Sequence, residues 1–454
     1  MYLDRLSLKN FKCFPEQEVH LAKITLLLGA NSTGKSSLIY SLLAALQSDQ
    51  FPLALSANGP LVTLGDFRSI SYLHRPNHEI GIGLKLSGQN LATLTLKGIY
   101  SASSKTGMPQ LSEAELAGAA LNLRVKKEDK YKAEWTYDST KDPMKEFRES
   151  GVFKKFFQAL GELEKGLKKD NKESQATEPT SMVDPFGMPP PSGSFSFSSP
   201  NEIFKSLSAP KYIRLGPQIA TLTNSLVEFQ KGFNYVGSFR MEPQRTYYRV
   251  SKGDLKVKRD GTNYIEQIID WEEKKASELS QLKQSLRKLR LLSSLHTGRL
   301  RSGIFEVNIR TSRTTVPVSL ADVGFGIGQV LPILVADLQL PKEGTLAISQ
   351  PEIHLHPSVQ ADLADYFVNR ALRKDFRYII ETHSEYFINR LRLLVSKGKI
   401  APKDISILYL SSDGNRISSH EIVFNPDGRI EGAPKDFFQT YMMDVMNIAM
   451  EASA

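Results

Sequence analysis

Cysteine and long apolar runs are scarce in this sequence. Cys13 is the single cysteine among 454 residues, which excludes a disulfide framework and any zinc site built from cysteines. No apolar run approaches the roughly 20 residues that span a bilayer, and the charged, alternating N-terminal stretch is unlike a signal peptide. We therefore expect a cytoplasmic protein with no membrane partner.

The overall composition is that of an ordinary folded chain. Hydrophobic residues make up 41% and charged residues 24% of the sequence, and these proportions exclude global disorder. Lysine and arginine (58) outnumber aspartate and glutamate (49), which gives a formal net charge of +9. This mild excess permits a nucleic-acid partner without requiring one.

Hydrophobic periodicity predicts an α/β fold. Alternation over 2–8 and an apolar run over 24–28 predict strands, and the pattern over 35–47 predicts an amphipathic helix. Alternating stretches over 79–100 and 119–128 predict an antiparallel β region. Buried parallel strands are expected over 345–349, 376–382 and 405–410.

Three segments between these regions have a different character. Residues 142–169 show a basic helical pattern. Residues 168–210 are rich in Ser, Pro and Gly and predict a disordered or mobile loop, with a short linear motif as the less favoured alternative to a plain linker. Residues 271–295 predict a helical arm or subdomain, because about three heptads are too few for an extended coiled coil.

A phosphate-binding pattern follows the strand predicted over 24–28. Residues 29–36 fit G-x-x-x-x-G-K-[ST] between a strand and a helix, which is the context the pattern needs. Its backbone N–H groups can surround a phosphate, Lys35 can reach the β- and γ-phosphates, and the Ser36 hydroxyl can ligate Mg²⁺. A chance glycine turn is the less favoured interpretation. The predicted nucleotide-binding residues are Gly29, Asn31, Ser32, Thr33, Gly34, Lys35, Ser36 and Ser37.

Three segments of the C-terminal half supply further candidates. Residues 323–329 place glycines at the start of a helix, where backbone N–H groups and the helix dipole favour an anion. The strand over 345–349 leads into residues 350–357, and the next strand ends in residues 381–384. A histidine just past the carboxyl end of a central strand, here His383, points to the crevice where α/β sheets bind ligands.

In this order, the segments resemble the ATPases of the ABC/SMC type. The phosphate loop, the glycine-rich signature, "PEIHLHP" and "ETHSEYFINRL" carry the resemblance, and RecF-like and overcoming-lysogenisation-defect-like members of the AAA family are similar. "KNFKCF", "YVGSFRMEPQRTYY" and "FNPDGRIEGAPKDFF" resemble the defence-associated subgroup, such as the ATPase subunits of the PARIS and Septu anti-phage systems. The resemblance covers roughly residues 1–100 and 235–445.

The resemblance implies an ABC-type P-loop ATPase head that binds ATP and Mg²⁺. Such heads form a homodimer or higher homo-oligomer, with the phosphate loop of one subunit facing the signature of the other. It implies that Lys12 lies near the nucleotide, although a surface lysine is an equally good interpretation. It also implies that Gly326 and Gln329 face the γ-phosphate in trans and that His383 senses it.

Several positions depart from the pattern of these ATPases. Gly328 stands where they have the signature serine, and Ser349 where they have the Walker B acid. Gln350 stands at the position of the catalytic glutamate and can orient water without accepting its proton. Glu352 is the nearest carboxylate and could take either role, although a structural or subunit-contact role is at least as good an interpretation. Because loss of a general base costs about 10²–10⁴-fold, we predict tight ATP–Mg²⁺ binding with slow or partner-activated hydrolysis.

Two other groups of residues are open to a functional interpretation. His354 and His356 would share one side of an extended segment, but no third ligand follows at a useful spacing, which favours structural or interface roles. The arginine-rich stretch over 299–313 could line a groove for DNA or for an acidic protein. The tail beyond Thr382 is too short for a metal-dependent nuclease, so effector chemistry is expected from another chain.

The resemblance divides the chain into three parts and leaves more than one function open. An N-terminal lobe with the phosphate loop covers 1–135, an arm insertion with the loop 168–210 and a return strand region 235–250 covers 136–300, and a C-terminal lobe covers 301–454. The favoured hypothesis is a sensor or scaffold in bacterial anti-phage defence that holds a separate toxin or nuclease encoded nearby and responds to a phage trigger protein. The alternative is a RecF-like DNA-repair ATPase that grips duplex DNA, and a transporter subunit is disfavoured.

Overall fold

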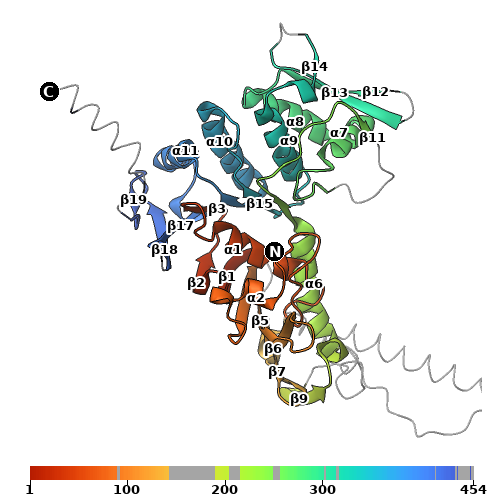
Figure 1. Ribbon diagram of the computed structural model, residues 1–454, viewed down its shortest axis with the longest axis vertical. Coiled ribbons are helices and arrows are strands. Elements are labelled where there is room, and N and C mark those ends of the chain that lie inside the picture. The colour runs from red at the N-terminus through yellow and green to blue at the C-terminus, as the bar shows by residue number, and fades with distance from the viewer. Residues whose placement is uncertain are drawn as a thin grey trace, which may run out of the picture. The chain divides into compact units, whose positions relative to one another are not determined.

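The computed structural model describes residues 1–88, 93–142, 190–203, 215–248, 256–300, 303–312, 316–414, 416–434, 437 and 450. The chain forms two compact units (Figure 1). The first contains mainly Leu3–Glu18 and Ser41–Glu228, and the second contains mainly Val19–Tyr40 and Phe229–Ala454. The second unit therefore contains the phosphate loop together with all three C-terminal segments that carry candidate site residues.

An eight-stranded sheet, in the order β2-β1-β4-β5-β6-β7-β8-β9, dominates the first unit. Its strands are β1 (Tyr2–Phe11), β2 (Phe14–His20), β4 (Ile80–Ser87), β5 (Leu94–Ala102), β6 (Pro109–Ala117), β7 (Leu121–Lys127), β8 (Tyr131–Tyr137) and β9 (Ser192–Phe197). Neighbouring strands from β4 to β9 are antiparallel, which confirms the predicted antiparallel region. One face is buried because alternate residues point inward, as Leu121, Leu123 and Val125 do on β7.

The last strand of this sheet corrects one prediction. Residues 192–197 are not part of a mobile loop but form β9, which pairs with β8. The sequence "SGSFSF" alternates, and Phe195 and Phe197 are buried, with Phe197 stacked on Tyr131 at a centroid distance of 5.7 Å. Residues 168–189 and 204–210 of the predicted loop, and 143–169 of the predicted helix, lie outside the described residues.

A seven-stranded sheet, in the order β10-β15-β16-β3-β17-β18-β19, organises the second unit. Its strands are β3 (Ile24–Gly29), β10 (Phe233–Val236), β15 (Thr345–Ser349), β16 (Arg377–Glu381), β17 (Ile405–Ser412), β18 (Ile417–Phe424) and β19 (Ile430–Glu431). Five neighbouring strands of this sheet are parallel, in the order β10, β15, β16, β3 and β17. This confirms the predicted parallel strands. All five residues of β15 are buried, as expected for a strand covered on both faces.

Helices and a small sheet complete the second unit. The helices are α1 (Lys35–Leu46), which runs on into the first unit, α7 (Tyr264–Glu273), α8 (Ser277–Lys288), α9 (Phe325–Leu338), α10 (Pro357–Lys374) and α11 (Glu385–Ser396). The small sheet contains β11 (Tyr247–Tyr248), β12 (Ser294–Arg299), β13 (Ile304–Arg310) and β14 (Val318–Ser319). The first unit also has α2 (Phe67–Ile70), and α6 (Gly216–Gly232) leads from the first unit into the second.

The helical pattern predicted over 271–295 is not one continuous helix. α7 ends at Glu273, Lys275 has a positive φ of 51°, and α8 begins at Ser277. The chain then enters β12 at Ser294. Leu282 and Leu286 of α8 are buried in the main core of the unit, so the segment packs as a helical subdomain against its neighbours.

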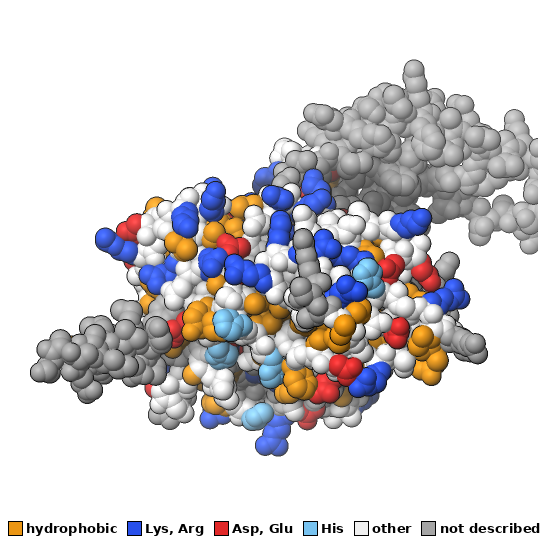
Figure 2. All heavy atoms as spheres, turned by 90° about the horizontal axis from the view of Figure 1, so that it is seen from above, with side chains coloured by type: hydrophobic (Ala, Val, Ile, Leu, Met, Phe, Trp, Pro, Cys, Tyr) orange, Lys and Arg blue, Asp and Glu red, His pale blue; other side chains and the backbone are white. Residues whose placement is uncertain are grey.

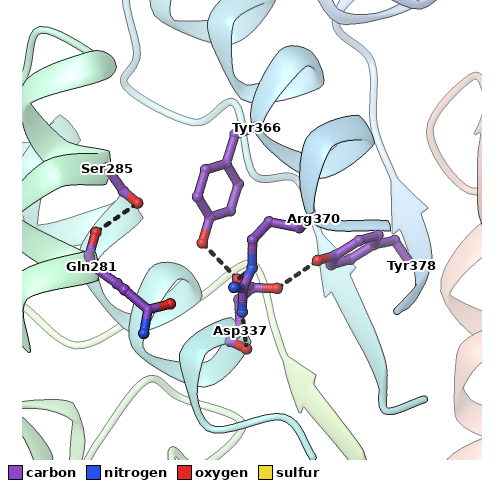
Figure 3. A network of polar contacts seen from close by, with 6 residues as sticks. All are labelled: Gln281, Ser285, Asp337, Tyr366, Arg370 and Tyr378. Carbon is purple, nitrogen blue, oxygen red and sulfur yellow. Dashed lines mark hydrogen bonds and ion pairs between the residues drawn. The ribbon is translucent and has the colours of Figure 1, made fainter. Parts of the chain in front are cut away.

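A buried carboxylate fastens α9 to α10 and β16 (Figure 3). Asp337 on α9 is 0% exposed. It accepts hydrogen bonds from the hydroxyls of Tyr366 and Tyr378, each at 2.5 Å, and from Arg370 Nε at 2.7 Å. Because Arg370 brings the opposite charge, the carboxylate is both neutralised and hydrogen-bonded, which offsets the cost of its burial.

Candidate functional site

The phosphate loop joins β3 to α1, as predicted. Gly29 has a φ of 134°, and a Cβ on it would lie 2.0 Å from the carbonyl oxygen of Leu410 on the neighbouring strand. Gly34 has a φ of 95°. Both positions therefore require glycine. Asn31 and Ser32, at the tip of the loop, are exposed, so the tip is open to a ligand.

Lys35 holds this loop in its present conformation. Its Nζ donates to the carbonyl oxygens of Gly29 at 2.9 Å and Ala30 at 2.6 Å, and the Thr33 hydroxyl donates to Ala30 O at 2.8 Å. Burial lowers the pKa of Lys35, while the charge of Glu381 acts in the opposite direction. The ammonium group thus lies inside the loop that has to surround a phosphate.

Glu381 is the carboxylate that meets the phosphate loop. The Ser36 hydroxyl donates to Glu381 Oε1 at 2.8 Å and lies 3.1 Å from Oε2. The Ser349 hydroxyl donates to Oε2 at 2.9 Å. Glu381 is only 5% exposed. It was not among the predicted site residues, although it stands directly before Thr382 and His383 in a segment that was singled out.

The order of the strands explains why Glu381 takes this position. β16 lies between β15 and β3, and the register pairs Glu381 with Ser349 on one side and with Leu27 on the other. A side chain at the end of β16 is therefore closer to the phosphate loop than one at the end of β15. A motif read along the chain does not reveal this order.

Side chains from β10 and from the segment that follows it fix the end of β15. Tyr235 and Ser349 hydroxyls lie 3.2 Å apart, and since Ser349 donates to Glu381, Tyr235 donates to Ser349. Arg240 Nη2 donates to the carbonyl oxygens of Ser349 at 2.5 Å and Gln350 at 3.2 Å. Burial raises the pKa of Tyr235 to about 12 and lowers that of Arg240 to about 10. Neither residue was predicted, although both lie in the quoted stretch "YVGSFRMEPQRTYY".

Gln350, Glu352 and His383 come together next to this cluster. Gln350 has a φ of 50°, and its N–H donates to Glu381 O at 2.6 Å. Glu352 Oε1 accepts a hydrogen bond from the His383 N–H at 2.7 Å. Burial raises the pKa of Glu352, and partial burial and the Lys35 charge lower that of His383. The carboxylate of Glu352 thus contacts the chain that follows β16, while the Ser36 hydroxyl bonds to Glu381.

The glycines of the signature lie at the start of a helix, as the sequence predicts. α9 begins at Phe325, so Gly326 and Gly328 belong to its first turns. A Cβ on Gly326 would lie 2.6 Å from His354 O, and one on Gly328 would lie 2.7 Å from Pro243. The glycines therefore permit close packing within the chain. Gln329 is buried, and its amide nitrogen lies 3.5 Å from Arg240 O, so contact with a partner's phosphate would require it to leave this position.

The other predicted residues have separate surroundings. His354 and His356 do not lie on an extended segment, because residues 351–354 form a turn and His354 has a φ of 61°. His356 Nδ1 accepts a bond from the Ser358 N–H at 3.3 Å and so caps α10. Lys12 belongs to the first unit, and its role near the nucleotide stays a prediction.

The arginine-rich stretch over 299–313 is described only in part. Residues 301–302 and 313 of this stretch lie outside the described residues.

The described part of the chain contains neither a metal-binding cluster of side chains nor a helix that could span a membrane. Among those residues, no three His, Cys, Asp or Glu side chains gather as a metal site would require. Within the same ranges, every helix is too short or too polar to cross a bilayer.

Comparison with known proteins places the chain in a family. A family model described as an AAA ATPase domain matches residues 1–388. Similar solved structures include an SMC head bound to the C-winged helix domain of ScpA, which is 10% identical with a TM-score of 0.46 over 93% of this chain and 98% of that one. An SMC head with an extended coiled coil bound to the C-terminal domain of ScpA, from Pyrococcus furiosus, is 11% identical with a TM-score of 0.42 over 100% of both chains. The SMC head domain from Thermotoga maritima is 10% identical with a TM-score of 0.37 over 92% and 98%.

These structural scores are low, and no curated protein sequence matches the chain. The family model, in contrast, spans far more than half of the sequence and includes the phosphate loop, the signature, "PEIHLHP" and the residues that follow β16. The chain belongs to the AAA ATPase domain family.

Proposed function

We propose that this ATPase is an ATP-gated sensor or scaffold in bacterial anti-phage defence. It binds ATP and Mg²⁺, closes onto a second copy through the bound nucleotide, and hydrolyses ATP slowly or only in an activated complex. The closed state holds a separate effector, a toxin or nuclease. A phage trigger shifts this state, which requires that the trigger bind the open and closed states with different affinity.

The position of the carboxylates carries the slow-hydrolysis part of the proposal. Glu381 is engaged by the hydroxyls of Ser36 and Ser349, and Glu352 accepts the His383 N–H. Gln350, at the position of the catalytic glutamate, has no group that accepts a proton from water. An ATPase without a positioned base is expected to lose about 10²–10⁴-fold in rate.

The residues present fit ATP and its metal by their chemistry. Mg²⁺ prefers oxygen ligands, and the Ser36 hydroxyl lies in the first turn of α1 with the Glu381 carboxylate 2.8 Å away. Lys35 offers a positive charge, and the exposed loop tip offers backbone N–H groups. When bound, Mg²⁺ supplies positive charge that neutralises the phosphates. The chain itself contributes binding and orientation.

The defence role rests on the resemblance of the quoted motifs. On the face shown in Figure 2, lysine and arginine side chains are interspersed with hydrophobic and acidic ones. Duplex DNA binding that ATP stimulates and salt weakens steeply would instead favour the RecF-like alternative. Co-purification of the chain with the product of a neighbouring toxin or nuclease gene, dependent on ATP, would support the scaffold role.

Gln350→Glu tests the slow-hydrolysis part directly. The substitution supplies a proton acceptor at the end of β15, so the single-turnover hydrolysis rate should rise at least about tenfold. Lys35→Ala is the control and should abolish ATP binding, because it removes the ammonium group inside the loop. Wild type that hydrolyses tens of ATP molecules per second without a partner would contradict the proposal.

The same variants test the assembly step by size measurement with and without ATP. Wild type is expected to increase in mass when ATP is present, and Lys35→Ala is expected to keep its mass. A monomer that is unchanged for both proteins in both conditions would contradict ATP-bridged assembly.

A further inference from the structure

The ends of three neighbouring strands, β15, β16 and β3, lie side by side in register next to the phosphate loop. The register pairs Ser349 on β15 with Glu381 on β16, and Glu381 with Leu27 on β3, close to the phosphate loop. Ser36, at the start of α1, reaches the same carboxylate. The strand end at which this family pattern expects an acid therefore presents a serine, and the adjacent strand end presents a glutamate.

We propose that Glu381 is the carboxylate that positions the magnesium ion of bound ATP, and that it has taken over this task from position 349. This inference rests on the proposed binding of ATP–Mg²⁺ and assigns a residue of this chain to it. Glu381 acts toward the ion directly or through a metal-bound water, together with the Ser36 hydroxyl.

The hydrogen bond between Ser36 and Glu381 has the polarity that metal binding needs. A hydroxyl that donates its proton to a carboxylate keeps its oxygen lone pairs free, and these are what Mg²⁺ takes as a ligand. The carboxylate also has lone pairs beyond the two serine bonds, with which it can hold a metal-bound water. In phosphate-loop ATPases, a serine or threonine of the loop and an acid from a strand end hold the metal together.

The serine at position 349 follows from this arrangement. An acid there would place a second carboxylate at the register partner of Glu381, where repulsion between like charges would raise the pKa of one of them. Ser349 instead donates to Glu381 Oε2 at 2.9 Å and receives a hydrogen bond from Tyr235. Tyr235 and Ser349 thus orient the relocated carboxylate toward Ser36.

The other carboxylates near the sheet have different partners. Glu352, which is half-buried, accepts the His383 N–H at 2.7 Å through Oε1, while its Oε2 has no hydrogen-bond partner among the described residues. Asp337 accepts Arg370 Nε and two tyrosine hydroxyls on the side of β16 toward which Tyr378 points. Glu381 is the carboxylate to which the Ser36 hydroxyl donates.

Glu381→Gln tests the assignment through the effect of the metal on nucleotide affinity. The ratio of the ATP Kd in EDTA to the ATP Kd in Mg²⁺ measures how strongly the metal and the nucleotide support each other. The variant should lower this ratio about 10- to 100-fold, the loss typical when a residue that orients a metal site is replaced. Its Kd in EDTA should stay near that of wild type, which also reports a folded phosphate loop. Mn²⁺ bound in the presence of ATP, measured by electron paramagnetic resonance, should weaken in parallel.

Two further variants sharpen the result. Glu272→Gln is a matched control, since Glu272 is a half-buried glutamate that accepts a bond from the Thr297 N–H at 3.1 Å, and it should leave the ratio unchanged. Ser349→Asp combined with Glu381→Gln returns the acid to β15 and should restore at least part of the metal effect.

The outcomes separate this inference from the proposed function. Wild type that binds no ATP, with or without Mg²⁺, would contradict both. Wild type with a clear metal effect that Glu381→Gln leaves intact would contradict the assignment alone. The same holds if Glu352→Gln, and not Glu381→Gln, removes the metal effect.

Discussion

Two buried carboxylates meet strand β16, namely Asp337 of α9 and Glu381 of β16 itself, and their partners differ in one respect. Tyr378 donates to Asp337, which also accepts Arg370 Nε and the Tyr366 hydroxyl. Glu381, three residues farther along and therefore pointing to the opposite side of the strand, accepts two serine hydroxyls and has no arginine in contact among its described partners. Asp337 is neutralised by the Arg370 guanidinium, whereas Glu381 has two serine donors and interacts electrostatically with the nearby Lys35.

On our proposal for Glu381, the difference separates a structural carboxylate from one that acts on a ligand. A buried charge is retained at low cost only when a partner charge and hydrogen bonds compensate it. Asp337 has both, and it joins three elements of the fold. Glu381 has neutral donors and lies against a loop whose tip is open, so a divalent cation would complete its surroundings.

The largest effect that tests this comparison is on stability. Asp337→Asn removes the negative charge and leaves Arg370 partly buried without its partner, a change that typically costs about 3–5 kcal/mol. We expect the free energy of unfolding in urea to fall by this amount. Glu381→Gln keeps an oxygen that accepts a serine hydroxyl, and without nucleotide it should cost about 1 kcal/mol or less.

A nucleotide measurement on the same pair completes the test. Asp337→Asn protein that is still folded should bind ATP with the metal effect of wild type, in contrast to Glu381→Gln. Equal losses of stability in the two variants would show that the two carboxylates are equivalent, and the distinction would then be wrong.

A smaller effect is expected from Tyr378→Phe. The variant removes one hydrogen bond to a charged group, which typically contributes about 1.5–3 kcal/mol, and keeps the ring that packs 4.8 Å from Phe367. The loss should appear as a lower urea midpoint with an unchanged slope. The ATP Kd should not change, because the hydroxyl lies on the side of β16 away from Ser36. A change in the ATP Kd without a change in stability would mean that the two sides of the strand are coupled.

The sequence predicts the phosphate loop and its flanking elements well, because these depend on local signals. Gly29 and Gly34 are required by the backbone, and the strand and helix around them have clear periodicity. Glu381 was missed because its role depends on β16 lying between β15 and β3, and strand order is a non-local property. β9 was missed for a related reason, since its alternation is short and only pairing with β8 reveals it.

The smallest predicted effect concerns Glu352, whose Oε1 accepts one backbone N–H from His383 at 2.7 Å and whose Oε2 has no hydrogen-bond partner among the described residues. Burial raises its pKa above the ordinary value of 4.5. The folded state then holds this proton more tightly than the unfolded state, so the contribution of Glu352 to stability is complete below pH 4.5 and is lost as the pH rises through the folded pKa. Glu352→Gln lacks this loss and can still accept the His383 N–H. The melting temperature of the variant minus that of wild type should therefore increase from pH 5 to pH 8, and a difference that stays constant or decreases would mean that burial does not disfavour the charged form of Glu352.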